Sequence, residues 1–366
     1  TCTLFLVPCT FMRIVFITRS TLYSAPGGDT TQVLATAKYL RRAAIHVDVK
    51  LSTDSIEYHL YDLLHFFNII RPADILKHLK SRKPYVISTI FVEYAGFDKK
   101  QRKGLAGLLF KIMPVAWIEY AKTIARYLAG RDEIASREYL WLGHHRAIKK
   151  ILQGAVCLLP NSESEYQRLV RTFGIRKNYF VVPNGIDTEV FPPGADVAKD
   201  PLMVVCAARI EGIKNQLNLI RALRNSKFNL YLIGDPAPNQ LKYYEACRRA
   251  AAKNIFFINN LPQRALRDYY IRAKVHVLPS WFETTGLSSV EAAAMGCNIV
   301  ISEKGDAKEY FGSEAFYCDP ASPASILQAV ESAAASQGDD ALQIKIRTNF
   351  TWEQAAFITI RAYRAL

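Results

Sequence analysis

Residues 275–302 read Val275-His-Val-Leu-Pro-Ser280-Trp-Phe-Glu283-Thr-Thr-Gly286-Leu-Ser-Ser-Val-Glu291-Ala-Ala-Ala-Met-Gly296-Cys-Asn-Ile-Val-Ile-Ser302. The stretch begins and ends with β-branched apolar runs, which are typical of buried strands. The segment between them predicts a turn followed by a helix. Strands that alternate with helices form parallel sheets covered on both faces, so we expect an α/β fold.

Two glutamates, Glu283 and Glu291, lie in this stretch, one on the turn that leaves the strand and one about two helical turns later. Gly286 allows close approach of a backbone, and the free N–H groups at the helix start suit a diphosphate. A site with one carboxylate for a sugar, one for a ribose and a phosphate-binding segment between them suits a nucleotide sugar. Two glutamates at such spacing also occur as solvated helix positions, and the strand–turn–helix setting favours the site.

The arrangement resembles the E-x7-E motif of the retaining family-four glycosyltransferases (glycosyl transferases group 1), which have the GT-B fold. The resemblance implies a donor-binding site in the second half of the chain, with Glu283 as a catalytic residue. It also implies donor contacts from Thr285, Gly286, Leu287 and Glu291.

Arg209 and Lys214 follow a predicted strand at 203–207. An Arg and a Lys five residues apart on a strand-to-helix loop can converge on one anion and neutralise a diphosphate leaving group. Two solvated surface bases are the alternative, but loops at strand ends often carry function. The spacing resembles the family's R-x-x-x-x-K pair, so we assign both residues to catalysis and donor binding. The chain contains no D-x-D pattern, and we expect no metal or other cofactor beyond the nucleotide sugar, UDP- or GDP-linked.

The organisation expected from the resemblance is two Rossmann-like domains facing each other across a cleft. Residues 1–190 are expected to form an acceptor-binding domain, residues 191–350 a nucleotide-sugar-binding domain, and residues 351–366 a helix that crosses back to the first domain. Polar residues at 192–200 suggest an interdomain linker. Residues 1–11 are apolar but too short to span a bilayer, and are either an extension before a start at Met12 or an added edge strand.

The length and composition agree with this organisation. A chain of 366 residues, half of them hydrophobic, is long enough for two cores. Seven scattered cysteines form no C-x-x-C pair, and their odd number argues against a closed disulfide framework. We therefore expect a reducing, cytoplasmic location.

The net charge of +14 is unevenly distributed. Residues 1–183 contain 27 Lys and Arg against 14 Asp and Glu, whereas the remainder contains 20 against 19. The asymmetry predicts an anionic partner for the first half. No nucleic-acid-binding signature accompanies the charge, so we expect no nucleic acid partner and instead an anionic membrane surface or a phosphorylated acceptor.

A basic cluster at 99–103 precedes an apolar run at 104–118. This combination suits insertion into an anionic interface, and a buried helix with a solvated lead-in is the alternative. With the charge asymmetry, it predicts peripheral association with the inner face of the plasma membrane.

Three further motifs resemble the family. Gly27-Gly28 follows the first predicted strand and resembles a loop whose backbone approaches the donor phosphates. The segment Pro183-Asn184-Gly185-Ile186-Asp187 resembles the family's hinge segment, which we interpret as mainly structural. Gly305-Asp306-Ala-Lys-Glu309 stands where relatives often carry G-G-x-x-E.

The first half departs from the family at its acceptor side. Where relatives carry V-H-x-H, the chain keeps His65 and has Phe67, and Phe91 stands where another histidine is common. We assign His65 and Glu93 to the acceptor side, with Glu93 as a substitute for the missing histidine, and interpret His65 as a packed or hydrogen-bonded histidine rather than a proton carrier.

The function expected from the sequence is a retaining, metal-independent glycosyltransferase. It would move a sugar from a nucleotide sugar to a hydroxyl of a glycan or lipid-linked acceptor, in cell-surface polysaccharide synthesis. Two alternatives stay open, a GT-B sugar-nucleotide 2-epimerase and a non-catalytic nucleotide- or glycan-binding module.

Overall fold

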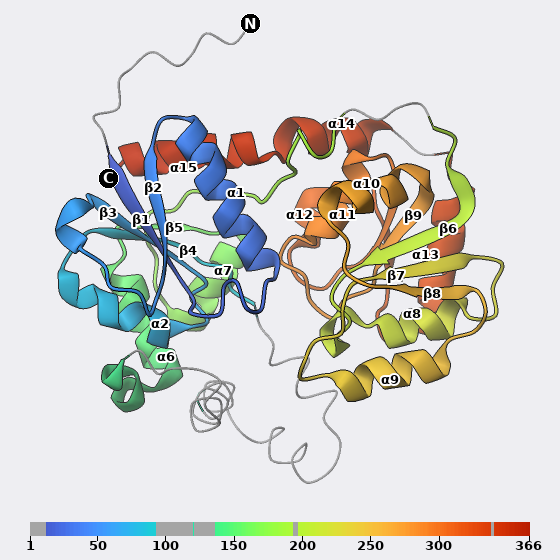
Figure 1. Cartoon of the computed structure of the whole chain (residues 1–366), viewed down its shortest axis with the longest axis horizontal. Helices are drawn as coiled ribbons and strands as arrows, with labels where there is room; N and C mark the ends of the chain where they lie inside the picture. Colours follow the sequence, from blue (N-terminus) through green and yellow to red (C-terminus); the bar gives the residue numbers. More distant parts are fainter. Residues whose placement is uncertain (1–11, 93–119, 121–135, 193–196, 338–339) are drawn as a thin grey trace, which may run out of the picture. The chain divides into compact units, whose positions relative to one another are not determined.

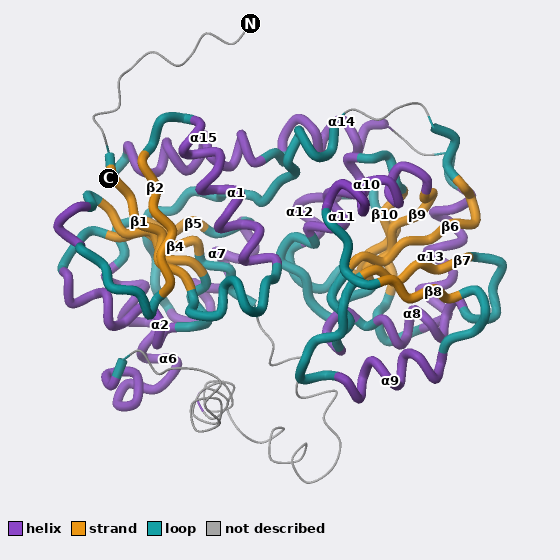
Figure 2. The backbone as a smooth tube through the Cα atoms, viewed as in Figure 1, coloured by secondary structure: helices purple, strands orange, loops and turns teal. Residues whose placement is uncertain are grey.

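The computed structural model describes residues 12–92, 120, 136–192, 197–337 and 340–366. The chain forms two compact units, which Figure 1 colours by position along the sequence. Of the described residues, 12–91, 120, 136–182 and 356–366 belong to the first (unit 1). Residues 92, 183–192, 197–337 and 340–355 belong to the second (unit 2). The predicted alternation of strands and helices is present in both units (Figure 2).

Unit 1 is built on a five-stranded parallel sheet in the order β2-β1-β3-β4-β5, a doubly wound order that changes direction between β1 and β3. The strands are β1 (Arg13–Thr18), β2 (His46–Leu51), β3 (Leu63–Phe67), β4 (Tyr85–Ser88) and β5 (Cys157–Leu159). The helices are α1 (Gly28–Arg42), α2 (Pro72–Leu76), α6 (Arg137–Gly154), α7 (Glu163–Phe173) and the end of α15 (Trp352–Arg364), with 3-10 turns at Tyr58–Leu60 and Lys77–Ser81.

Strands β1, β3, β4 and β5 of unit 1 bury both faces, as expected for a parallel sheet between helices, whereas the edge strand β2 is only partly buried. Leu64 and Phe66 of β3 pack in one cluster with Ile148 of α6 and Leu169 of α7. The intervening His65 is also fully buried and contacts Tyr363 of α15. Continuous burial explains why these strands are apolar throughout rather than alternating.

Unit 2 is built on a six-stranded parallel sheet in the order β11-β10-β9-β6-β7-β8. Numbered within the unit, this is the Rossmann order, which reverses between β6 and β9. The strands are β6 (Asp200–Ala207), β7 (Asn229–Ile233), β8 (Ile255–Ile258), β9 (Ala273–Leu278), β10 (Asn298–Ser302) and β11 (Phe316–Cys318). The helices are α8 (Gln216–Leu223), α9 (Leu241–Ala250), α10 (Gln263–Arg272), α11 (Leu287–Ala294), α12 (Ala307–Phe311), α13 (Pro323–Ala335) and α14 (Asp340–Asn349). The unit also contains a 3-10 turn at Gly212–Lys214 and the start of α15.

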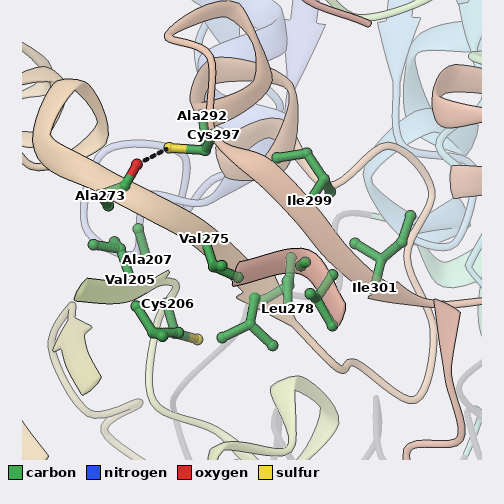
Figure 3. Packing of buried hydrophobic residues seen from close by; sticks show 14 of the residues in the cluster. Val205, Cys206, Ala207, Ala273, Val275, Leu278, Ala292, Cys297, Ile299 and Ile301 are labelled. Carbon is green, nitrogen blue, oxygen red and sulfur yellow. Dashed lines mark hydrogen bonds between the residues drawn. The ribbon is translucent and has the colours of Figure 1, made fainter. Parts of the chain in front are cut away.

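Helices cover both faces of the unit 2 sheet. Helices α8 and α13 pack together on one face, and α10 and α11 pack together on the other (Figure 1). Figure 3 shows the centre of the core, where apolar side chains of β6, β9 and β10 gather and the Cys297 thiol donates a hydrogen bond to the Ala273 carbonyl. A core of this kind fixes the strand ends, and so positions the loops that leave them.

The units differ from the expected domains at their boundaries. Residues 183–190 belong to unit 2 rather than to the first domain, and α15 starts in unit 2 and joins unit 1 from Ala356 onward. The expected linker at 192–200 is wrong in its last part, because β6 begins at Asp200 and the Lys199 ammonium is inserted into unit 2. Lys199 Nζ donates hydrogen bonds to four carbonyls at 2.9–3.2 Å, those of Tyr270, Ile271, Ala273 and Met295.

Candidate functional site

The loops that leave β6 and β9 carry most of the predicted site residues of unit 2. These two strands are neighbours, and the sheet order reverses between them. In open α/β sheets, ligands bind outside the carboxyl ends of the strands at such a point, because the adjacent loops run in opposite directions. Lys214 follows β6 and Glu283 follows β9, so topology alone brings both to this position.

Glu283 and Lys214 meet in an ion pair. Lys214 Nζ donates to Glu283 Oε1 at 2.6 Å, and Ser280 Oγ donates to the same oxygen at 2.6 Å. The Glu283 side chain is 10% exposed and that of Lys214 is 23% exposed, so the pair is only partly hydrated. Among the described residues, none donates a hydrogen bond to Glu283 Oε2. The arrangement presents one fixed carboxylate oxygen together with a cation at the carboxyl edge of the sheet.

The main chain of Glu283 is fixed by the segment after β10. Asp306 N donates to the Glu283 carbonyl at 2.7 Å, and Glu283 N donates to the Lys304 carbonyl at 3.1 Å. Gly305 lies between these bonds with φ +100°, and a Cβ added there would be 2.0 Å from the Glu283 carbonyl oxygen. Only glycine fits this close approach. The glycine of the G-D-x-x-E segment therefore serves to place the Glu283 backbone.

Asn215 joins the two loops, and sequence reasoning missed it. Its side-chain amide donates to the carbonyls of Pro279 and Pro320 at 3.1 and 2.7 Å, and its own backbone is left-handed, with φ 62°. Trp281 N donates to the Ile213 carbonyl at 2.8 Å, a second link between the loops. The distance between Lys214 and Glu283 is thus set by backbone contacts on both sides.

Arg209 has a different partner from Lys214. Its Nε is 3.7 Å from Glu211 Oε1, and its side chain is 40% exposed. The structure therefore pairs the two predicted bases with two different carboxylates, whereas the sequence suggested a single shared anion. An exposed Arg with a long ion-pair distance can reorient towards a ligand at low energetic cost.

Gly286, Leu287 and Glu291 lie on or beside α11, as the sequence predicts. Gly286 precedes the helix, Leu287 is its first residue, and Glu291 is in its second turn. The Glu291 side chain accepts a hydrogen bond from Gln263 Nε2 at 3.1 Å. Burial raises the pKa of Glu291 to about 7, and the Gln263 hydrogen bond acts in the opposite direction.

Thr285 links the site to the hinge segment within unit 2. Its buried Oγ1 accepts from Asn184 Nδ2 at 3.1 Å and donates to Tyr310 OH at 3.2 Å. The neighbouring Gly185 packs against the backbone of Phe350 and Thr351, where an added Cβ would be 2.4–2.6 Å from carbonyl atoms. These contacts give the Asn-Gly pair a structural role and fix the Thr285 side chain beside it.

In unit 1, the Gly27-Gly28 loop lies at the corresponding reversal point, after β1. Arg19 forms this loop by donating to both carboxylate oxygens of Asp29 at 2.6 and 2.9 Å and to the carbonyls of Thr21 and Ala25. Burial alone would raise the pKa of Asp29, but the hydrogen bond and charge of Arg19 outweigh it and hold the pKa below its usual value. The loop is therefore shaped by a partly buried Arg–Asp pair that the sequence did not reveal.

His65 is a packing residue. It is fully buried, its Nδ1 forms a hydrogen bond with Tyr363 OH at 2.6 Å, and its Nε2 forms one with Ser88 Oγ at 2.9 Å. Its ring stacks on that of Phe67 with centroids 4.3 Å apart. Burial lowers the pKa of His65 to about 3, so the ring stays neutral. These contacts contradict its assignment to the acceptor side, because both nitrogens are engaged inside the unit.

Glu93, the other acceptor-side prediction, lies outside the described residues, as do the basic cluster at 99–103, the apolar run at 104–118 and residues 1–11. The described chain leading to Glu93 is held by a different carboxylate. Glu165 is fully buried and accepts hydrogen bonds from Phe91 N at 2.8 Å and Asn161 N at 2.9 Å, as well as from Thr89 Oγ1. It fixes the path of the loop after β4.

With this geometry in place, the chain can be compared with known proteins. Residues 187–349, which include every predicted site residue of unit 2, match the family described as "Glycosyl transferases group 1". The match covers less than half of the chain, and over these residues the chain resembles that family. The family resemblance seen in the E-x7-E motif is therefore confirmed.

Curated relatives match part of the chain. A D-inositol 3-phosphate glycosyltransferase from Kribbella flavida is 29% identical over 180 residues, 43% of this chain and 42% of that protein. A glycogen synthase from Mycobacterium tuberculosis is 27% identical over 198 residues, 50% of this chain and 48% of that protein. The alignments thus span less than half the length of these glycosyltransferase relatives.

Solved structures resemble the whole chain. A sucrose-phosphate synthase from Thermosynechococcus elongatus superimposes with a TM-score of 0.73 at 18% identity, covering 96% of this chain and 98% of that one. The Anabaena protein HepE in complex with UDP-glucose gives a TM-score of 0.67 at 15% identity, covering 97% and 100%. These likenesses confirm the predicted fold, α/β with two Rossmann-like domains, as in GT-B glycosyltransferases.

Three further observations concern metal ions, membranes and cysteines. Among the described residues, no group of three or more His, Cys, Asp or Glu side chains is arranged to hold a metal ion. No helix in the described part of the chain is long and apolar enough to cross a membrane. The five cysteines within the described ranges, Cys157, Cys206, Cys247, Cys297 and Cys318, are free and buried.

Proposed function

We propose that this protein is a retaining, metal-independent glycosyltransferase that moves a sugar from a nucleotide-sugar donor to an acceptor hydroxyl. The observation that carries the proposal is the meeting of Glu283, Lys214 and Ser280 at the reversal point of the unit 2 sheet. A carboxylate beside a cation suits a donor that has hydroxyls on its sugar and negative charge on its diphosphate.

The chemistry follows from the charges. When the bond between the sugar and the diphosphate breaks, negative charge develops on the leaving phosphate oxygen, and pre-positioned cations stabilise it. We assign this role to Lys214 and to Arg209, whose exposed guanidinium can turn from Glu211 towards the phosphate. Glu283 would accept hydrogen bonds from sugar hydroxyls through the oxygen that Lys214 and Ser280 leave open. Retention would result from attack by the acceptor hydroxyl on the face that the nucleotide leaves.

The donor proposed first is UDP-linked, with a GDP-linked sugar second. Support comes from HepE, a structural neighbour that was solved with UDP and with UDP-glucose. The remaining donor contacts are assigned to the backbone of Gly286 and Leu287 at the start of α11, to Thr285 and Glu291, and to the Gly27-Gly28 loop of unit 1. Helix starts supply free N–H groups for such a diphosphate.

The acceptor is proposed to be a glycan or a lipid-linked glycan precursor in cell-surface polysaccharide synthesis, bound by unit 1. The charge excess of residues 1–183 supports a cytoplasmic enzyme that associates with the anionic inner face of the plasma membrane. Vesicle sedimentation with anionic and neutral lipids tests this part separately.

Nucleotide-dependent thermal stabilisation tests the donor site. A ligand at 100 times its Kd stabilises the native state by about 2.7 kcal/mol. A domain of about 150–250 residues gains about 2–4 °C in Tm per kcal/mol, so a cognate nucleotide should raise Tm by about 5–10 °C. UDP, GDP and ADP are compared without added metal.

Two variants make this test specific. Lys214→Ala should abolish most of the shift, since a charge-assisted hydrogen bond contributes about 1.5–3 kcal/mol. Arg249→Ala is the matched control, because Arg249 is 72% exposed and pairs with Glu245 along α9. A nucleotide-induced Tm rise of similar size in both variants would refute the placement of the site. If no nucleotide raised the Tm of the wild type, the protein would instead be a binding module for another ligand. Product analysis separates transfer from 2-epimerisation.

A further inference from the structure

Gln263 is an exposed residue that contacts a buried carboxylate. It is the first residue of α10, and its Nε2 donates to Glu291 Oε1 on α11 at 3.1 Å. Helices α10 and α11 lie side by side on one face of the unit 2 sheet (Figure 1). Glu291 itself is only 8% exposed. The bond therefore ties a surface side chain of α10 to the second glutamate of the E-x7-E motif.

The two glutamates of the E-x7-E motif have partners of different kinds. Glu283 pairs with the ammonium of Lys214, whereas Glu291 pairs with a neutral amide. In the described part of the chain, no Lys or Arg forms an ion pair with Glu291. An amide donor fixes the orientation of a carboxylate without adding a compensating charge, so the second oxygen stays available as an acceptor.

The amide also favours the ionised form. Burial raises the pKa of Glu291 to about 7, and the hydrogen bond from Gln263 is what lowers it. Loss of this donor would leave a buried carboxyl group without a partner, which takes up a proton at neutral pH. A protonated carboxyl group accepts hydrogen bonds less well, and its rotamer would no longer be fixed.

We infer that Gln263 is a positioning residue for Glu291, which holds the carboxylate to accept hydrogen bonds from the vicinal hydroxyls of the donor's ribose. The inference deepens the proposed function and rests on it. It adds a specific consequence: the preference for a ribonucleotide over a deoxyribonucleotide depends on a glutamine that touches neither ligand. Loss of Gln263 should therefore weaken recognition of the ribose and leave recognition of the diphosphate intact.

The experiment measures Kd by calorimetry for UDP, 2′-deoxy-UDP and 3′-deoxy-UDP. If GDP is the nucleotide that stabilises the protein, the corresponding guanosine compounds are used. Wild type should prefer the ribonucleotide by about 10- to 100-fold over at least one deoxy form, since a hydrogen bond to a charged group has this strength. In Gln263→Leu the preference should fall below about 3-fold, with affinity for the deoxy forms unchanged.

Gln354→Leu is the matched control, because Gln354 is an exposed glutamine in the first turn of α15. It should keep the wild-type preference. Both variants replace exposed residues and should stay folded, with the Tm of Gln263→Leu a few degrees lower because it also removes a hydrogen bond to a buried carboxylate; unchanged affinity for the deoxy forms then separates positioning from folding.

The outcomes distinguish the inference from the proposed function. Failure of the wild type to bind any nucleoside diphosphate would overturn the proposed function. Binding with the same ribose preference in wild type and Gln263→Leu would overturn the inference alone. Binding by wild type without any preference for the ribonucleotide would do the same, because Glu291 would then not contact the ribose.

Discussion

Replacing Gly305 with alanine should destabilise unit 2 and displace Glu283. The new Cβ would be 2.0 Å from the Glu283 carbonyl oxygen and 2.8 Å from its nitrogen, at φ +100°. A non-glycine residue in a sparsely populated backbone region costs about 1–3 kcal/mol. Moving Glu283 away would also weaken the backbone bonds to Asp306 and Lys304, at about 1 kcal/mol each. The total loss is therefore about 3–5 kcal/mol.

Urea denaturation of Gly305→Ala measures this loss, and Gly174→Ala is its control. Gly174 has φ +67° with no atom within 4 Å of an added Cβ, so its replacement costs only about 1–2 kcal/mol of backbone energy. The difference between the variants isolates the contact with Glu283. Equal losses in the two variants would refute the role given to Gly305, and Gly305→Ala should in addition lose nucleotide binding.

Three further predictions concern buried polar groups. Burial lowers the pKa of His276 to about 3, so between about pH 6.5 and 3 the unfolded chain binds more protons than the folded chain, and stability falls as the pH is lowered. In His276→Leu, this part of the pH dependence of stability should be lost. Urea titrations at several pH values check this, and an unchanged slope would contradict it. Tyr363→Phe removes the partner of His65 Nδ1 and should cost about 1–2 kcal/mol and speed hydrogen exchange in α15, whereas wild-type protection would show that the bond is dispensable. Lys199→Met should lose about 2–4 kcal/mol, because it removes the charged donor that four carbonyls share, and a change below about 0.5 kcal/mol in urea denaturation would argue against a structural role.

The fold could be predicted from the sequence because its strands are short apolar runs bounded by turn residues. The strand expected at 203–207 lies within β6, and the apolar runs at the start and end of residues 275–302 lie within β9 and β10. The residues alone do not determine the order of these strands in the sheet, since nothing in the sequence states which strands pair. The resemblance to a family supplied that information.

The site was predicted in its main residues but not in its internal contacts. Lys214 and Glu283 were both recognised, yet their ion pair joins residues 69 positions apart and depends on β6 and β9 being neighbours. Gln263 and Arg19 could not be recognised, because a surface glutamine and an arginine in a loop are ordinary solvated residues until their partners are known. The interpretation of His65 as a packed, hydrogen-bonded histidine is confirmed, whereas its assignment to the acceptor side is not.

The central claim is that the carboxyl edge of the unit 2 sheet holds a nucleotide sugar through Glu283. It is tested most directly by the release of nucleoside diphosphate from a panel of UDP- and GDP-sugars in the presence of sugar acceptors. The wild type should release the nucleotide from at least one donor, and Glu283→Gln should lower the rate by about 100-fold or more, as removal of a group that stabilises a transition state does. Equal rates in wild type and Glu283→Gln would contradict the account.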